Sequence, residues 1–160
     1  MKKRLFFMFC FIQVIAFSVQ AQSNLEINNI FDKYGKQQGS VLVQLASDIL
    51  SQGSKITFYK SLIVNETDQN RREIYAALQA DIEGKVIISQ VNKNGRLESG
   101  SYYLGNSKSK GNEYLLYKNK GNKITLVYLV GNFSPARLEQ ELKKLKDLFI
   151  YVNDKRIKIQ

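Results

Sequence analysis

The chain has 160 residues, of which 44% are hydrophobic and 24% are charged, with ten glycines and one proline. These proportions exclude a fibrous or disordered chain and leave room for one globular domain. The formal net charge is +10, and the lack of histidine excludes Ser-His-Asp and Cys-His catalysis as well as histidine-centred metal sites.

The N-terminal segment, residues 1–21, is typical of a cleavable secretory signal peptide. Basic residues precede an apolar run from Leu5 to Val19, and Val19-Gln20-Ala21 puts small residues at the minus-three and minus-one positions of a signal-peptidase site. The run is about 15 residues long, shorter than the roughly 20 that span a bilayer. We therefore expect cleavage after Ala21, one domain over residues 22–160, and no transmembrane segment in the mature chain.

Cys10 lies inside the apolar run, whereas a lipidated cysteine follows such a run, so we expect no lipid anchor. Its removal leaves a mature chain without thiols, which excludes disulfides and thiolate zinc sites. Removal of Lys2, Lys3 and Arg4 lowers the formal charge by three, from +10 to +7. This charge favours acidic partners such as anionic lipid headgroups or polysaccharides, and an exported chain is not expected to bind nucleic acid.

The mature chain begins with a segment that predicts a helix over residues 23–34. Its apolar side chains fall mainly on one helical stripe. Ser23 or Asn24 is suited to the N-terminal cap, and Gly35 or Gly39 is suited to the end of the helix.

Two strands and a second helix follow. β-Branched and alternating apolar residues predict strands over residues 41–45 and 55–64, with a single helical turn over residues 46–51 between them. Apolar residues at four-residue spacing predict a helix over residues 68–83, with Thr67 as its cap.

The second half of the mature chain predicts a meander of four strands joined by tight turns. The strands are expected at residues 86–91, 96–104, 113–118 and 123–130. Ser134 as cap, Pro135 at the first helical position and a leucine-rich stripe reaching Phe149 then predict a final helix. Residues 150–160 are expected to form either a last strand or an ordered extension.

Two or three amphipathic helices and about six strands, mostly joined by hairpins, predict an α+β fold. We expect a largely antiparallel sheet that includes the C-terminal-half meander, with the helices packed on one face. The other face would then be open, and tyrosines are expected to supply it with aromatic side chains: Tyr59, Tyr102 or Tyr103, Tyr117 and Tyr128. Such a face would bind a ligand, a partner or a second copy, although tyrosine is also simply common in strands.

The meander should also gather basic residues. Its turns at residues 92–95 and 119–122 share one end of the sheet, and the loop at 106–111 lies at the other end. We therefore expect five basic residues to cluster at the first end: Lys93, Arg96, Lys118, Lys120 and Lys123. The cluster would meet an anionic surface, or it would only keep exposed hairpin tips soluble and unpaired.

The carboxylates and glycines do not form a pattern that predicts a catalytic, metal-binding or nucleotide-binding site. A glycosidase needs two converging carboxylates, whereas Asp81 with Glu83, and Glu139 with Glu141, point about 200° apart on a helix. The sequence also lacks a calcium loop, a P-loop and a dinucleotide-binding glycine pattern. We expect no catalytic residue, no cofactor and no metal.

Several short motifs accompany this order of elements. An export signal ends in Gln-Ala-Gln, Ile-Phe-Asp-Lys-Tyr occupies residues 30–34, Val-x-Val occupies 41–43, and Lys-x-Ile begins at Lys55. The pattern resembles the small exported domains of unknown function found in Bacteroidetes-type bacteria. This resemblance implies an α+β fold and an envelope location, and it implies no activity or catalytic residues.

The sequence supports one leading functional hypothesis and two alternatives. The leading hypothesis is a non-enzymatic binding module of the periplasm or outer cell envelope of a Gram-negative bacterium. Its partner would be an envelope protein, an anionic envelope component or a second copy. The alternatives are a carboxylate-dependent hydrolase acting on an envelope or extracellular substrate, and an electrostatic binder of envelope polyanions.

Overall fold

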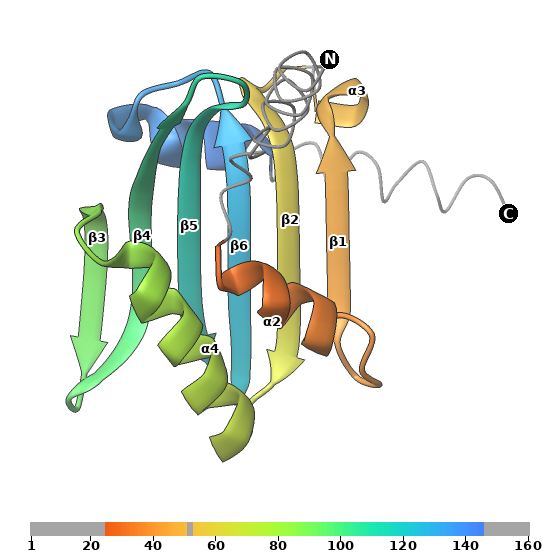
Figure 1. Ribbon diagram of the computed structural model, residues 1–160, viewed down its shortest axis with the longest axis vertical. Coiled ribbons are helices and arrows are strands. Elements are labelled where there is room, and N and C mark those ends of the chain that lie inside the picture. The colour runs from red at the N-terminus through yellow and green to blue at the C-terminus, as the bar shows by residue number, and fades with distance from the viewer. Residues whose placement is uncertain (1–24, 51–52, 146–160) are drawn as a thin grey trace, which may run out of the picture.

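The computed structural model describes residues 25–50 and 53–145 (Figure 1). Its elements in chain order are α2 (Ile27–Tyr34), β1 (Val41–Ala46), α3 (Ser47–Leu50), β2 (Ile56–Asn65), α4 (Asp68–Ile82), β3 (Val86–Lys93), β4 (Arg96–Ser107), β5 (Gly111–Lys120), β6 (Lys123–Gly131) and the 3-10 helix η1 (Pro135–Arg137). Residues 138–145 continue η1 as an α-helix. The predicted signal peptide and the tail at 150–160 lie outside the described residues.

All six strands belong to one sheet, in the order β1-β2-β6-β5-β4-β3. Every neighbouring pair is antiparallel. Strands β3 to β6 form the expected meander, and β6 returns to the centre of the sheet, where it pairs with β2. The prediction of an α+β fold with a largely antiparallel sheet is therefore confirmed.

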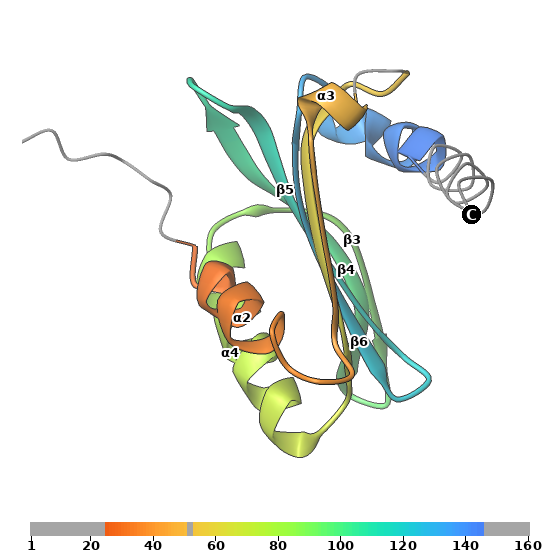
Figure 2. The ribbon, with the colours of Figure 1, turned by 90° about the vertical axis from the view of Figure 1, so that its right-hand side faces the viewer.

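Helices α2 and α4 lie side by side on one face of this sheet (Figure 2). Phe31 of α2 and Leu78 of α4 are fully buried, and they belong to one core cluster with Leu62, Leu126 and Tyr102 from the strands beneath. The amphipathic stripes of both helices therefore bury the same face of the sheet, as expected.

The C-terminal helical segment packs on the opposite face. Leu138 and Leu145 form a second buried cluster with Phe133, and the strands contribute Tyr114 and Leu129 to it. Two helices, α2 and α4, thus share one face as expected, but the opposite face is not left open. The leucine stripe predicts that the helix buries one side, but it carries no information about which face of the sheet receives that side.

Local signals at the helix ends are partly confirmed. Thr67 and Asn70 form a reciprocal capping box at the start of α4, with the Thr67 hydroxyl 3.2 Å from the Asn70 amide nitrogen. Ser134 occupies the cap of η1 but accepts no side-chain hydrogen bond from it. The start of α2 is capped from a distance, because the Asp81 carboxylate accepts hydrogen bonds from the amides of Glu26, at 2.8 Å, and Ile27, at 2.9 Å.

In the described part of the chain, no helix combines the length and the apolar character that a membrane span requires.

Candidate functional site

An open cleft of about 650 Å³ lies between helix α4 and the edge strand β3. Gly84, in the left-handed conformation at φ +67°, reverses the chain after α4, so that β3 returns alongside the helix. Tyr75, Gln79 and Ile82 line the cleft from α4, and Ile87 and Gln90 line it from β3. The cleft therefore forms at the sheet edge, where α4 does not cover the last strand.

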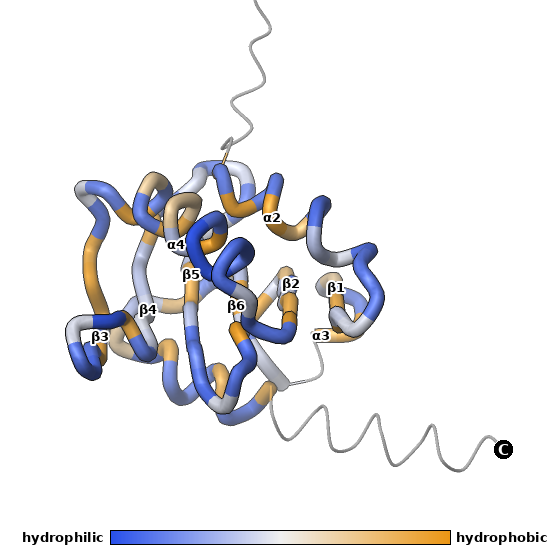
Figure 3. Tube along the Cα trace, turned by 90° about the horizontal axis from the view of Figure 1, so that it is seen from below, coloured by the Kyte–Doolittle hydropathy of each residue, from blue (hydrophilic) through white to orange (hydrophobic). Residues whose placement is uncertain are grey.

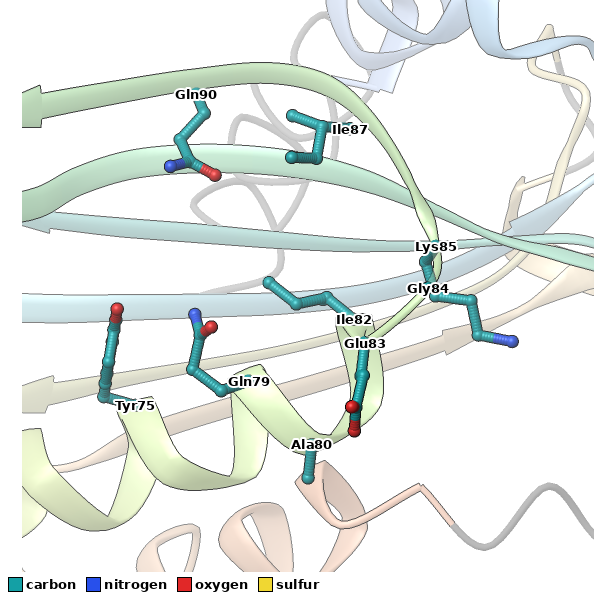
Figure 4. Close-up of a pocket in the computed structure, with 9 residues that line it drawn as sticks. All are labelled: Tyr75, Gln79, Ala80, Ile82, Glu83, Gly84, Lys85, Ile87 and Gln90. Atoms are coloured by element: carbon teal, nitrogen blue, oxygen red, sulfur yellow. The ribbon is translucent and has the colours of Figure 1, made fainter.

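The lining combines apolar and hydrogen-bonding groups. Figure 4 shows Tyr75, Gln79 and Ile82 extending from the helix toward the strand, and the oppositely charged Glu83 and Lys85 line the cleft where the helix leads into the strand. Amide side chains both donate and accept hydrogen bonds, and the phenol of Tyr75 does the same. Such a surface suits a neutral ligand with polar groups and apolar side chains.

A hydrogen bond from the neighbouring strand β4 holds the β3 wall of the cleft in place. The buried Tyr102 hydroxyl donates a hydrogen bond to Gln90 Oε1 at 3.2 Å. Burial raises the pKa of Tyr102, so its hydroxyl stays protonated and remains a donor at neutral pH. A register shift between Ile87 and Ser89 adds a β-bulge beside this contact, a feature that often re-aims a side chain near a functional site.

Two exposed apolar side chains line the same cleft. Of the seven large hydrophobic side chains that are exposed among the described residues, Tyr75 of α4 and Ile87 of β3 belong to its walls. Ile87 is 58% exposed and Tyr75 44% exposed. The sequence interpretation missed this site. Its only local signal was the uninterrupted Val86-Ile87-Ile88 run. Side chains alternate between the two faces of a strand, so Ile87 must point to the opposite face from Val86 and Ile88.

The four predicted tyrosines do not share one open face. Tyr117 and Tyr128 point toward α2 and α4 and are buried, whereas Tyr59 and Tyr103 lie on the opposite face and are half-buried. The expectation of one tyrosine-bearing binding face is therefore wrong. Side chains alternate along each strand, and the sequence did not reveal which alternate positions would meet the helices.

Tyrosines on the face opposite α2 and α4 build the second core. The Tyr103 hydroxyl donates to Asn112 Oδ1 at 2.9 Å, and the Tyr103 ring lies 5.4 Å from the Tyr114 ring. Tyr114 in turn stacks on Phe133 at 4.9 Å between ring centroids. The aromatic groups there pack against each other and against residues that lead into the C-terminal helix, which is a structural role.

The five predicted basic residues are placed at or near one end of the sheet. Lys93 pairs with Arg96 at the β3–β4 turn, and Lys120 pairs with Lys123 at the β5–β6 turn. Lys118 lies two residues before the second turn, opposite Ser99 of β4. Asn94 and Gly95, at φ 51° and 73°, form the tight first turn that the Asn-Gly pair predicts.

A second cleft, of about 390 Å³, joins these two hairpins. Lys93 and Arg96 line it together with Asn119 from β5. Acidic groups also lie here: Glu98 lines the cleft, and Glu66 accepts hydrogen bonds from Asn119 and Arg71, both at 3.0 Å. Those hydrogen bonds hold the pKa of Glu66 below its usual value. The basic cluster is therefore partly balanced by carboxylates.

The buried Asp81 and Glu141 and the half-buried Glu73 serve structural contacts. Asp81 caps α2, and Glu141 accepts a hydrogen bond from the Lys55 amide at 2.9 Å and pairs with Lys144 at 3.0 Å. Glu73 accepts hydrogen bonds from Lys33 and Tyr34, both at 2.6 Å, and so joins α2 to α4. Among the described residues, no group of three or more acidic or cysteine side chains is arranged to hold a metal ion.

The sequence matches the model of a protein family. A model described as a family of unknown function (DUF6108) covers residues 14–142, which is most of the chain. No curated protein matches the sequence. The resemblance to a domain of unknown function is thereby confirmed, while bacterial origin and export remain predictions from the sequence. The chain belongs to the DUF6108 family of unknown function.

Proposed function

We propose that the protein is an exported, non-enzymatic binding module of the cell envelope and that the cleft between α4 and β3 receives an extended polypeptide segment of an envelope partner. The observation that carries this proposal is that an exposed apolar side chain lies on each wall of the cleft, Tyr75 on α4 and Ile87 on β3. A large exposed apolar patch with a polar rim marks an interaction site more often than an inert surface.

The edge position of β3 suits an extended segment. A strand at the edge of a sheet presents backbone donors and acceptors on its outer side, and such groups can pair with another chain. Ile82 and Ile87 would take an apolar side chain of the segment, while Gln79 and Gln90 would bind its backbone amides. Binding of this kind needs no catalytic group.

A photo-crosslinking experiment tests this proposal. A photoreactive phenylalanine analogue is placed at two cleft positions, Ile87 and Gln79. The control position is Lys108, in the loop that follows the last residue of β4. We expect irradiation of producing cells to give the same discrete adduct from positions 87 and 79, and none from position 108. Adducts that are equal at all three positions, or absent from all three, would contradict the proposal.

A substitution that adds a charge to the cleft gives a second test of this proposal. Replacing exposed Ile87 by lysine introduces a charge into the apolar part of the cleft, so the adduct formed through the probe at Gln79 should fall at least about tenfold. Lys110→Ala, at an exposed position that does not line the cleft, should leave that adduct unchanged. Thermal unfolding of both variants checks that the fold is retained.

The hairpin cleft supports a second candidate function, binding of an anionic envelope component. Lys93 and Arg96 converge there and supply its positive charge. The double variant K93A/R96A should lose binding to anionic lipid vesicles, whereas K108A/K110A, at the other end of the sheet, should retain it. Raising salt to about 1 M, where the screening length is about 3 Å, should also abolish binding. Binding that survives high salt would exclude an electrostatic binder.

A further inference from the structure

Strand β1 forms the other edge of the sheet, opposite β3 (Figures 1 and 3). Its sequence, Val-Leu-Val-Gln-Leu-Ala, contains no charge and no proline. Val41 is 52% exposed and Leu42 is 40% exposed. An uncharged apolar edge is open to pairing with another strand, because its outer backbone groups have no neighbour in the sheet.

The two edges differ in how they resist such pairing. Strand β3 has two register shifts, and it ends at Lys93, opposite Arg96. Strand β1 pairs with β2 in unbroken register from Val41 to Ala46. Bulges and charges are common protections of sheet edges. Because β1 has neither, it can accept a strand along its whole length, whereas the register shifts in β3 limit backbone pairing there to short stretches.

The sequence of β1 is complementary to itself in antiparallel register. In a continuous sheet, paired residues must point to the same face, so a two-fold axis passes through one residue of the strand. An axis through Val43 places Val43 opposite Val43 of the second copy, and Val41 opposite Leu45. One face of the new pair would then be apolar along its whole length.

The charges beside β1 are also complementary. Lys36 lies in the turn before the strand, and Asp48 lies in α3 directly after it. Both side chains are exposed, and neither belongs to an ion pair within the described part of the chain. Antiparallel pairing about a two-fold axis brings the Lys36 end of one copy beside the Asp48 end of the other, and it does so twice.

We propose that β1 pairs antiparallel with β1 of a second copy, centred on Val43, so that two six-stranded sheets join into one continuous sheet. A single strand pair buries less surface than a standard protein interface, so the dimer is concentration-dependent. This inference goes beyond the proposed partner cleft, which lies at the opposite edge and would remain open in the dimer.

Analytical ultracentrifugation of the chain purified from the envelope fraction tests the dimer. We expect the average mass to rise from monomer to dimer with concentration. Val43→Lys places two ammonium groups opposite each other on the axis and should raise the dissociation constant more than about tenfold. Val91→Lys, at a half-exposed position on β3, is the matched control and should change the dissociation constant less than about twofold.

Charge reversal gives a test that does not depend on a substitution within the strand. Asp48→Lys or Lys36→Asp alone should weaken the dimer about tenfold, because each makes two attractive contacts repulsive. The double variant K36D/D48K exchanges the charges and should restore the dissociation constant to within about threefold. Circular dichroism confirms that each variant is folded.

The proposal is overturned if the chain stays monomeric at every concentration, if Val43→Lys and Val91→Lys act equally, or if the double variant is no stronger than the single ones. A monomeric chain that crosslinks to a different protein from position 42 would also overturn it, since β1 would then serve a foreign strand. None of these results bears on crosslinking from position 87, so the two proposals fail separately.

Discussion

At the scale of single residues, the helices that cover the sheet are joined by a few carboxylates. Glu73 of α4 binds Lys33 and Tyr34 of α2, and it also accepts a hydrogen bond from Gln69 at 3.1 Å. Hydrogen bonds from Lys33, Tyr34 and Gln69 lower the pKa of Glu73 to about 2. The ionised carboxylate is thus part of the contact between α2 and α4.

This contact should make stability depend on acid. The pKa of Glu73 is lower in the folded chain than its ordinary 4.5, so the folded state binds a proton less readily than the unfolded state. Its stabilising contribution is present above pH 4.5 and is lost as the pH falls toward 2. Chemical unfolding as a function of pH should show that Glu73→Gln removes this part of the acid dependence.

The exposed Glu139 serves as the control for that measurement. Glu139→Gln should change the unfolding free energy at neutral pH by less than about 0.5 kcal/mol. The difference between wild type and Glu73→Gln should shrink toward pH 2. A difference that is constant from neutral pH to pH 2 would mean that the effect of Glu73 is packing and not ionisation.

Asp81 gives a second prediction at this scale. Burial removes water from the Asp81 carboxylate and raises its pKa, although the hydrogen bonds from the Ile27 and Glu26 amides act to lower it. Asp81→Ala leaves those two amides without their acceptor and should cost about 1–3 kcal/mol of unfolding free energy. Glu83→Ala, two residues later and exposed, should change it by less than about 0.5 kcal/mol. Equal losses would contradict the capping role.

At the scale of elements, the C-terminal helix shows how a correctly predicted helix can receive an unexpected place. The sequence predicts its start near Pro135 and its leucine stripe, and residues 135–145 are indeed helical. Its attachment depends on tertiary contacts: Leu138 is 3% exposed in the second core, and Glu141 accepts a hydrogen bond from the Lys55 amide next to β2. The far part of the predicted helix lies outside the described residues.

The buried Leu138 should therefore contribute strongly to stability. Leu138→Ala leaves a cavity between the helix and the sheet, and it should lower the unfolding free energy by about 2–5 kcal/mol. Leu142→Ala, at a half-buried position one turn later, should cost less than half as much. Denaturant unfolding of both variants measures the difference, and equal small effects would mean that the helix is not firmly packed on this face.

At the scale of the whole molecule, the two edge strands of the sheet, β1 and β3, are proposed to bind different partners. The helices α2 and α4 cover one face, the C-terminal helix covers part of the other, and exposed apolar side chains remain mainly at β1, α3, α4 and β3. The cleft beside β3 is proposed to take a partner, and β1 a second copy. Neither depends on the tyrosines from which the sequence predicted an interaction face.

Export is the whole-molecule prediction that depends on sequence alone. Protein recovered from the envelope fraction should begin at Gln22, and N-terminal sequencing or intact mass measures this directly. Ala21→Arg places a large charged residue at the cleavage site and should leave the precursor uncut. A recovered chain that still begins at Met1 would show that residues 1–21 are not a cleaved signal.

Local patterns were enough to predict the elements and their type. The strands, the Thr67 cap, the Asn94-Gly95 turn and the gathering of Lys93, Arg96, Lys120 and Lys123 at adjacent turns all follow from neighbouring residues and from meander geometry. The excluded histidine chemistry follows from composition. These features involve short segments, whose conformation is set by near neighbours in the chain.

Only the tertiary structure decided which face each side chain occupies and what remains uncovered. Tyr117 and Tyr128 became core residues, the last helix took the opposite face, and α4 stopped short of β3 to leave the cleft. A strand alternates and a helix has a stripe, but neither pattern specifies its partner. Long-range contacts such as that of Asp81 with the amides of Glu26 and Ile27 supply this choice, and no local spacing in the sequence encodes them.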